Sequence, residues 1–168
     1  MKKTLLFGIL CFVALAVNAQ YVDLGLTSGT LWRDANEPGY NAQNALADVE
    51  EDIPTRKQWE ELIKECEWTW QGDAYSVKGP NGKMIAFPVE GFRNFVDEAN
   101  IEGESKIGYY WTADQAKQQE GYYVYIDAKT KEIRTFDNRN GLCVRLVMSA
   151  EKAKALAKEK ATSTEGKK

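Results

Sequence analysis

The chain has 168 residues, with 22 Lys plus Arg, 25 Asp plus Glu and no histidine. Without histidine it lacks the commonest general base, the commonest zinc ligand and every Ser-His or Cys-His nucleophile pair, which excludes most hydrolase mechanisms. Residues 20–149 hold 14 Lys plus Arg against 22 Asp plus Glu, a net charge of −8 that repels phosphate backbones. We therefore expect no nucleic acid partner.

The first 19 residues have the pattern of a signal peptide. Met1-Lys2-Lys3 is followed by an apolar run that ends at Val17-Asn18-Ala19, a small-residue pattern that signal peptidase accepts. We expect cleavage after Ala19 and export to the periplasm, the cell surface or the extracellular space. No later stretch approaches the roughly 20 apolar residues of a spanning helix, so we expect no membrane insertion. The remaining length suits one domain, over residues 20–149.

The first predicted elements are a hairpin and a short helix. Two β-prone runs, residues 21–26 and 30–32, flank the polar turn Thr27-Ser28-Gly29, and this pattern predicts a hairpin. Apolar residues then repeat at helical spacing over residues 42–49. They predict a first helix that ends in the acidic cluster Glu50-Glu51-Asp52.

The second predicted helix has a defined start and one apolar face. Thr55 and Gln58 have the spacing of a capping box, in which each side chain bonds the other residue's backbone N–H. The apolar residues that follow lie at i, i+3, i+4 and i+7 and predict a buried stripe: Trp59, Leu62, Ile63 and Cys66.

The rest of the domain has the pattern of short strands. The turn Gly79-Pro80-Asn81-Gly82 predicts a hairpin of residues 74–78 and 83–87. Further runs predict a terminal antiparallel meander: residues 108–112, 122–126, 132–136 and 141–148. In the second of these runs, Tyr123 and Tyr125 should face opposite to Tyr122 and Val124. In the last run one parity is apolar, and the other, which includes Cys143 and Arg145, is mixed and is expected to point away from the main apolar face. Two helices with small antiparallel sheets and long loops make the fold class α+β.

The C-terminal residues differ from the domain in charge. Residues 150–168 hold six Lys against three Glu, a net charge of +3, and Leu156 is their one large apolar residue. Because such a segment cannot bury an apolar stripe, it predicts a basic tail that is disordered or a frayed helix. The tail is either an electrostatic tether to an anionic surface or a solubilising segment.

Two cysteines remain after the expected cleavage. Export would place Cys66 and Cys143 where a disulfide can persist. Two alternatives stay open: a disulfide between them, or a plain buried thiol at Cys66, which belongs to the predicted helical stripe.

Several blocks of the chain resemble a known family of secreted domains, the Fibrobacter succinogenes major paralogous domains, which are related to the C-terminal domain of the Legionella collagen-like adhesin. Residues 21–32 are similar to the family's opening "VDLGLPSGTLW", and residues 108–112 to its "GYYWSS". The other matching blocks are Pro54-Thr55 with Trp59-Glu60-Glu61-Leu62 ("RLPT..EWEEL"), residues 87–93 ("LPAAGYR") and residues 141–147 ("GLSVRLV").

The resemblance implies a C-type-lectin-like fold, with two helices beside small sheets, termini paired as neighbouring strands and long loops at the opposite end. It also implies an envelope or surface protein of a Bacteroidetes-type bacterium. The chain departs from the family at two places: Ile53 stands where the family has Arg-Leu, and residues 34–52 are shorter than the usual insert bearing "YFAWGE".

The candidate ligand-binding residues lie at two places. Asp137-Asn138-Arg139-Asn140 is the densest polar turn, just before the last predicted strand, and the alternative is an ordinary β-turn. Trp111, with Asp114 and Gln115 after it, forms the second candidate contact. The aromatic residues could build a sugar-stacking platform or fill the core of the sheet: Trp68, Trp70, Tyr109, Tyr110, Trp111, Tyr122, Tyr123 and Tyr125.

No cofactor or metal is expected. The acidic residues between Asp97 and Glu104 match no calcium-site spacing, and a plain acidic loop is the alternative to a calcium site. Gly79-Pro80-Asn81-Gly82-Lys83 is a hairpin turn, not the strand-to-helix loop that cradles a phosphate.

Three functions fit these observations. The first is an exported, non-catalytic binding module for a glycan or protein ligand, favoured by the missing catalytic groups. The second is a carboxylate-based enzyme acting on a glycan, which needs two carboxylates about 5–10 Å apart in a cleft. The third is a structural or assembly subunit of a surface complex, with oligomeric state left open.

Overall fold

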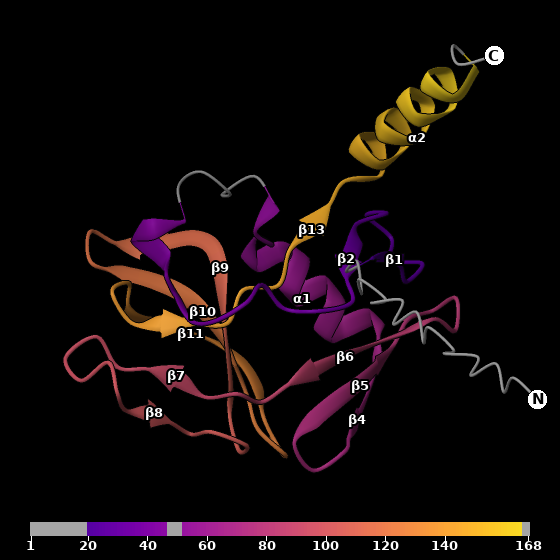
Figure 1. Ribbon diagram of the computed structural model, residues 1–168. Coiled ribbons are helices and arrows are strands. Elements are labelled where there is room, and N and C mark those ends of the chain that lie inside the picture. The colour runs from indigo at the N-terminus through magenta and orange to yellow at the C-terminus, as the bar shows by residue number, and fades with distance from the viewer. Residues whose placement is uncertain (1–19, 47–51, 166–168) are drawn as a thin grey trace, which may run out of the picture.

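The computed structural model describes residues 20–46 and 52–165 (Figure 1). The strands of these residues form four small sheets, of order β1-β2-β13, β11-β10-β9, β3-β12-β7-β8 and β4-β5-β6, and all pairs within them are antiparallel. The elements are β1 (Tyr21–Asp23), β2 (Leu31–Arg33), β3 (Asn41–Ala42), the 3-10 helix η1 (Gln43–Ala45), α1 (Arg56–Glu65), β4 (Glu67–Trp70), β5 (Ala74–Lys78), β6 (Met84–Pro88), β7 (Phe92–Arg93), β8 (Ile101–Glu102), β9 (Gly108–Lys117), β10 (Glu120–Ile126), β11 (Lys131–Asp137), β12 (Gly141–Leu142), β13 (Val147–Met148) and α2 (Ala150–Glu165). The predicted mixture of helices and small antiparallel sheets is confirmed.

The first sheet joins the two ends of the domain. Strands β1 and β2 form the predicted hairpin, with Val22 opposite Trp32, and Gly29 N closes the turn by donating to Leu26 O at 2.9 Å. Strand β13 pairs with the other edge of β2, where Val147 lies opposite Trp32. The start and the end of the domain are therefore fixed to one another.

Helix α1 confirms the predicted capping box. Thr55 Oγ1 accepts from Gln58 N at 3.3 Å, and Gln58 Oε1 accepts from Thr55 N at 2.8 Å. Trp59 and Leu62 are fully buried, as the stripe requires. Cys66 is the C-cap of the helix and is partly buried against the same core.

Strand β10 lies between two hydrophobic clusters. Val124 and Ile126 pack in the cluster that contains Trp59 of α1. Tyr123 and Tyr125 pack in the other, with aromatic residues of β9. The predicted alternation of these strand residues is confirmed, and the two-sided packing makes the β11-β10-β9 sheet the centre of the framework.

The structure adds one strand to those predicted and lengthens another. Strand β4 was not predicted and directly follows α1, with Trp70 opposite Tyr75 of the predicted hairpin. Strand β9 continues from Thr112 to Lys117, so that Asp114 and Gln115 lie within a strand rather than after it.

The predicted first helix is wrong over its described part. Ala42 is extended and pairs with Gly141, and only the three residues of η1 turn as a helix. The reason is that Gln43 points inward, where its Nε2 donates to Thr112 O at 2.8 Å. Residues 47–51 of that prediction lie outside the described residues.

The last predicted strand, residues 141–148, divides into β12 and β13. Its two faces are both buried, because Leu142 and Val144 pack in one cluster while Cys143 and Val147 pack in the other. Cys143 thus points away from the face of Leu142 and Val144, as expected, but its own face is buried as well.

The basic tail is helical over residues 150–165 and stands away from the body (Figure 1). Of the predicted alternatives, disorder is thus wrong for these residues; residues 166–168 lie outside the described residues. Lys152 Nζ is 2.5 Å from Asp52 Oδ1, near the start of the helix. Within the described ranges, no helix combines the length and apolar character needed to cross a membrane.

Candidate functional site

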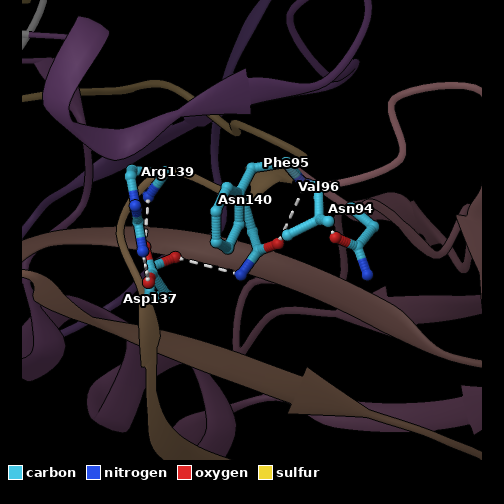
Figure 2. A network of polar contacts seen from close by, with 6 residues as sticks. All are labelled: Asn94, Phe95, Val96, Asp137, Arg139 and Asn140. Carbon is cyan, nitrogen blue, oxygen red and sulfur yellow. Dashed lines mark hydrogen bonds and ion pairs between the residues drawn. The ribbon is translucent and has the colours of Figure 1, made fainter.

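The turn Asp137–Asn140, the main predicted site, is occupied by its own hydrogen bonds (Figure 2). Asn140 Oδ1 accepts from Phe95 N at 3.3 Å and its Nδ2 donates to Asp137 O at 3.2 Å. Asn138 and Asn140 are only 5% and 4% exposed. Asn140 holds the turn against the neighbouring loop, and Asn138, whose backbone N–H donates to Gln119 O at 3.0 Å, is buried beside it. Because both side chains are buried, their prediction as ligand contacts is wrong.

Asp137 and Arg139 remain accessible but bond each other. Arg139 Nε donates to Asp137 Oδ1 at 2.9 Å and its second guanidinium nitrogen to Oδ2 at 2.6 Å, a bidentate pair. These side-chain bonds hold the pKa of Asp137 below its ordinary value. The guanidinium also lies beside the ring of Phe95 (Figure 2), and its carbon is 4.0 Å from the ring centre. Both the cation and the anion of this turn are thus already paired.

The second predicted contact also belongs to the framework. Trp111 is fully buried, and its Nε1 donates to Asn41 O at 2.7 Å, so it cannot meet a ligand, and its prediction is wrong. Asp114 Oδ2 accepts from Arg56 N at 2.7 Å, at the start of α1. Gln115 is exposed on β9, opposite Gly121 of β10.

Cys66 and Cys143 are free thiols, which rules out the disulfide alternative. They belong to different local environments. Burial, with Glu65 and Glu61 nearby, raises the pKa of Cys66 to about 11. Burial and then Glu90 raise the pKa of Cys143, whose Sγ donates to Glu90 Oε2 at 3.4 Å. Neither thiol has the lowered pKa of a nucleophile.

A buried arginine near the C-terminus was not recognised from the sequence as a structural centre. Arg145 is fully buried and donates to three oxygens: Asn36 Oδ1 at 2.8 Å, Arg33 O at 2.8 Å and Ala86 O at 2.7 Å. Its guanidinium lies 4.4 Å from the ring centre of Phe87. The signal in the sequence was a charged residue inside an apolar strand, which must be well paired when it is buried.

The loops around this arginine border an open pocket of about 440 Å³, here called the Arg145 pocket. One wall is the segment 34–39, and the other includes Pro88 and Glu90. Asn36 joins the walls, because its Nδ2 donates to Glu90 Oε2 at 2.9 Å. The pocket is therefore shaped by a loop that the core fixes through Arg145.

A second pocket, of about 280 Å³, shares Pro88 and Glu90 with the first. We call it the carboxylate pocket, because Asp73, Glu90 and Glu104 all line it. Tyr40 forms part of the same wall and donates its hydroxyl to Glu90 O at 2.5 Å. Among residues 20–46 and 52–165, however, no group of three or more acidic or cysteine side chains is arranged to hold a metal ion.

A third pocket, of about 370 Å³, shares Ser105 with the carboxylate pocket. We call it the aromatic pocket, after Trp70 and Tyr125. Its remaining wall comes from the β4–β5 loop, residues 105–107 and the β10–β11 turn, and the picture places these segments together at the lower end of the molecule (Figure 1). Because each pocket shares lining residues with the next, the three form a row of adjoining pockets.

The fold and its row of pockets define a mixed α/β domain that carries open, loop-lined pockets on small antiparallel sheets. The chain belongs to the family described as "Domain of unknown function (DUF8237)", whose model matches residues 26–147. That match runs from the β1–β2 turn to β13 and leaves α2 outside it. Searches of curated proteins and of solved structures found no match.

Proposed function

We propose that this domain is a non-catalytic binding module that recognises a glycan or protein ligand at the bacterial envelope or surface. The observation that carries the proposal is the row of three adjoining pockets, lined by loops that the core holds in place. Rigid scaffolds that present loops commonly serve recognition. Export is supported by the N-terminal Lys2-Lys3 and the apolar run that follows them.

We also propose that the fold is C-type-lectin-like. Two features support this: the ends of the domain meet in the β1-β2-β13 sheet, and the family-like blocks supply its main framework residues. Trp32, Trp59 and Trp111, one from each of three such blocks, are all fully buried. A solved structure of the domain, compared with C-type lectins, tests this proposal.

The binding function is tested with the purified chain from Gln20 to Lys168. A glycan array and a pull-down from bacterial envelope and host extracts should yield a saturable ligand that is recovered chemically unchanged. Absence of any such ligand contradicts recognition, and turnover of the ligand contradicts the non-catalytic assignment.

One observation favours an alternative, a carboxylate-based glycan-active enzyme. Asp73, Glu90 and Glu104 line one pocket, and glycosidases use two carboxylates flanking the scissile bond. Against it, Glu90 already accepts hydrogen bonds from Asn36 and Cys143. The discriminating measurement is release of reducing ends from envelope polysaccharide by the chain and by a Glu104→Gln variant; release that the substitution abolishes would establish the enzyme.

A further inference from the structure

The aromatic pocket differs from the other two in its side chains. Two aromatic rings and two lysines line it, together with Asp127, whereas three carboxylates line the adjoining pocket. Its volume of about 370 Å³ is within the range of small-ligand sites, about 300–1,000 Å³. The side chains of this pocket therefore decide what kind of ligand it can take.

The two rings are held in place by the framework. Trp70 packs edge-on against Tyr75, with ring centres 5.0 Å apart. Tyr125 donates its hydroxyl to Asp127 Oδ2 at 3.0 Å, and the guanidinium of Arg134 lies 3.7 Å from its ring centre. Both rings are only partly buried. They offer fixed apolar surface to a ligand at little cost in side-chain entropy.

The charged groups of the aromatic pocket differ in whether they are already hydrogen-bonded within the protein. Asp127 is already bonded, because its Oδ1 accepts from Lys129 N at 2.8 Å and from Thr130 N at 2.7 Å, and these bonds lower its pKa. Lys106 and Lys129 also line the pocket, but their ammonium groups bond no residue in the described part of the chain. Two available cations thus lie beside one saturated anion, in a domain whose net charge is negative.

The backbone keeps the mouth of the pocket open. Gly72 has φ +102°, and no heavy atom lies within 4 Å of the place where its Cβ would be. Ser105, on the boundary with the carboxylate pocket, has φ +58°, a conformation that is uncommon for residues other than glycine and recurs at ligand sites. An extended ligand in the aromatic pocket therefore has the carboxylate pocket as its neighbouring site, across Ser105.

We propose that the aromatic pocket binds a uronic acid residue of an acidic polysaccharide, with the sugar ring on Trp70 and Tyr125 and its carboxylate at Lys106 and Lys129. Pyranose rings present C–H groups that pack on the negative faces of aromatic rings. The adjoining carboxylate pocket repels a second anion and accepts hydroxyl or amide donors. The ligand is accordingly a polymer in which uronic acids alternate with neutral sugars. This inference rests on the proposed binding function.

The test uses hyaluronan hexasaccharide, an alternating uronic acid and N-acetylhexosamine polymer, and chitohexaose as its neutral counterpart. Binding is followed by quenching of tryptophan fluorescence and by calorimetry. The acidic oligosaccharide should bind at least about tenfold more tightly than chitohexaose, and added salt should weaken it. Equal binding of both, or no binding of the acidic one at millimolar concentration, overturns the proposal.

Substitutions of residues that line the aromatic pocket test whether the ligand binds there. Trp70→Ala and the double variant Lys106→Ala/Lys129→Ala should each weaken hyaluronan binding about tenfold. Lys57→Ala/Lys64→Ala removes the same charge from the exposed side of α1, away from the pockets, and should bind as the parent does. Circular dichroism checks that each variant folds. If Trp70→Ala fails to fold, the double-lysine variant still tests the site, because both of its substitutions are at exposed side chains.

The outcomes distinguish failure of the assigned site from failure of the proposed binding function. If the glycan array or pull-down yields a ligand whose binding the Trp70 and double-lysine variants leave unchanged, the binding function stands and the assigned site is wrong. If no ligand is found in any of these experiments, both are wrong.

Discussion

The two turns at the ends of strand β11 have the same plan but different surroundings. Each begins with an aspartate and places a basic residue two positions later: Asp127 with Lys129, and Asp137 with Arg139. In the second turn the arginine folds back and forms a bidentate pair with its aspartate. In the first, Lys129 gives only its backbone N–H to Asp127, and Lys129 lines the aromatic pocket.

This difference teaches that a dense polar turn is not by itself a binding site. The residues of the Asp137 turn bond each other and the loop at Phe95, so their polarity stabilises the fold (Figure 2). At the Asp127 turn the backbone and Tyr125 satisfy the aspartate. There the basic side chain is available for a ligand.

The largest expected effect is the difference in stability between variants of Trp111, which is buried, and Trp70, which lines a pocket. Trp111→Ala removes a fully buried ring and its bond to Asn41 O, so we expect a loss of about 3–5 kcal/mol in the free energy of unfolding. Trp70→Ala, at a partly buried ring, should cost clearly less. Urea denaturation of both variants measures the difference, and equal losses would contradict the division between framework and pocket.

A smaller effect is expected within the Asp137 turn. Asn140→Ala removes the side-chain bonds to Phe95 N and Asp137 O, although Asp137 O keeps its bond from Asn140 N, so the free energy of unfolding should fall by about 1 kcal/mol. Gln115→Ala, an exposed side chain of the other predicted contact, is the matched control and should change stability little. If Asn140→Ala were as stable as the control and weakened ligand binding, the turn would be a site after all.

The parts of the fold that the sequence predicted are those with local causes. The hairpin at Thr27-Ser28-Gly29, the capping box of Thr55 and Gln58 and the alternation along β10 each depend on residues close in the chain. Strand β4 was missed because it follows α1 without a turn signal. The short first helix failed because Gln43 bonds a carbonyl 69 residues away, which helical spacing cannot reveal.

The site predictions that failed, at buried residues, failed for the same reason. Whether Trp111 and Asn140 face a ligand depends on Asn41 and Phe95, which come from distant segments. Trp70 and Tyr125 were recognised in the sequence as candidate platform residues. The sequence did not show that Lys106 and Lys129 line the same pocket. Hydrogen-bond satisfaction, which decides availability, is a property of the tertiary structure.

The smallest expected effect tests the comparison of the two turns directly, through the pKa values of the two aspartates. Both values are lowered, chiefly by Arg139 side-chain bonds at Asp137 and by the Lys129 backbone N–H at Asp127. Arg139→Ala should therefore raise the pKa of Asp137 toward its ordinary value of about 3.9. Lys129→Ala should leave Asp127 unchanged, because its backbone N–H remains. Carboxyl chemical shifts, followed by NMR as a function of pH, measure both.

The same variants should differ in acid stability. A carboxyl group whose pKa is lowered by folding stabilises the protein above its unfolded pKa, about 3.9, and this contribution is lost as the pH falls through the folded pKa. Arg139→Ala should thus make the melting temperature fall less steeply below pH about 4, whereas Lys129→Ala should keep the parent slope. A flattened slope in Lys129→Ala would mean that its ammonium group pairs with Asp127, and the pocket would then lack the available cation that distinguishes it from the Asp137 turn.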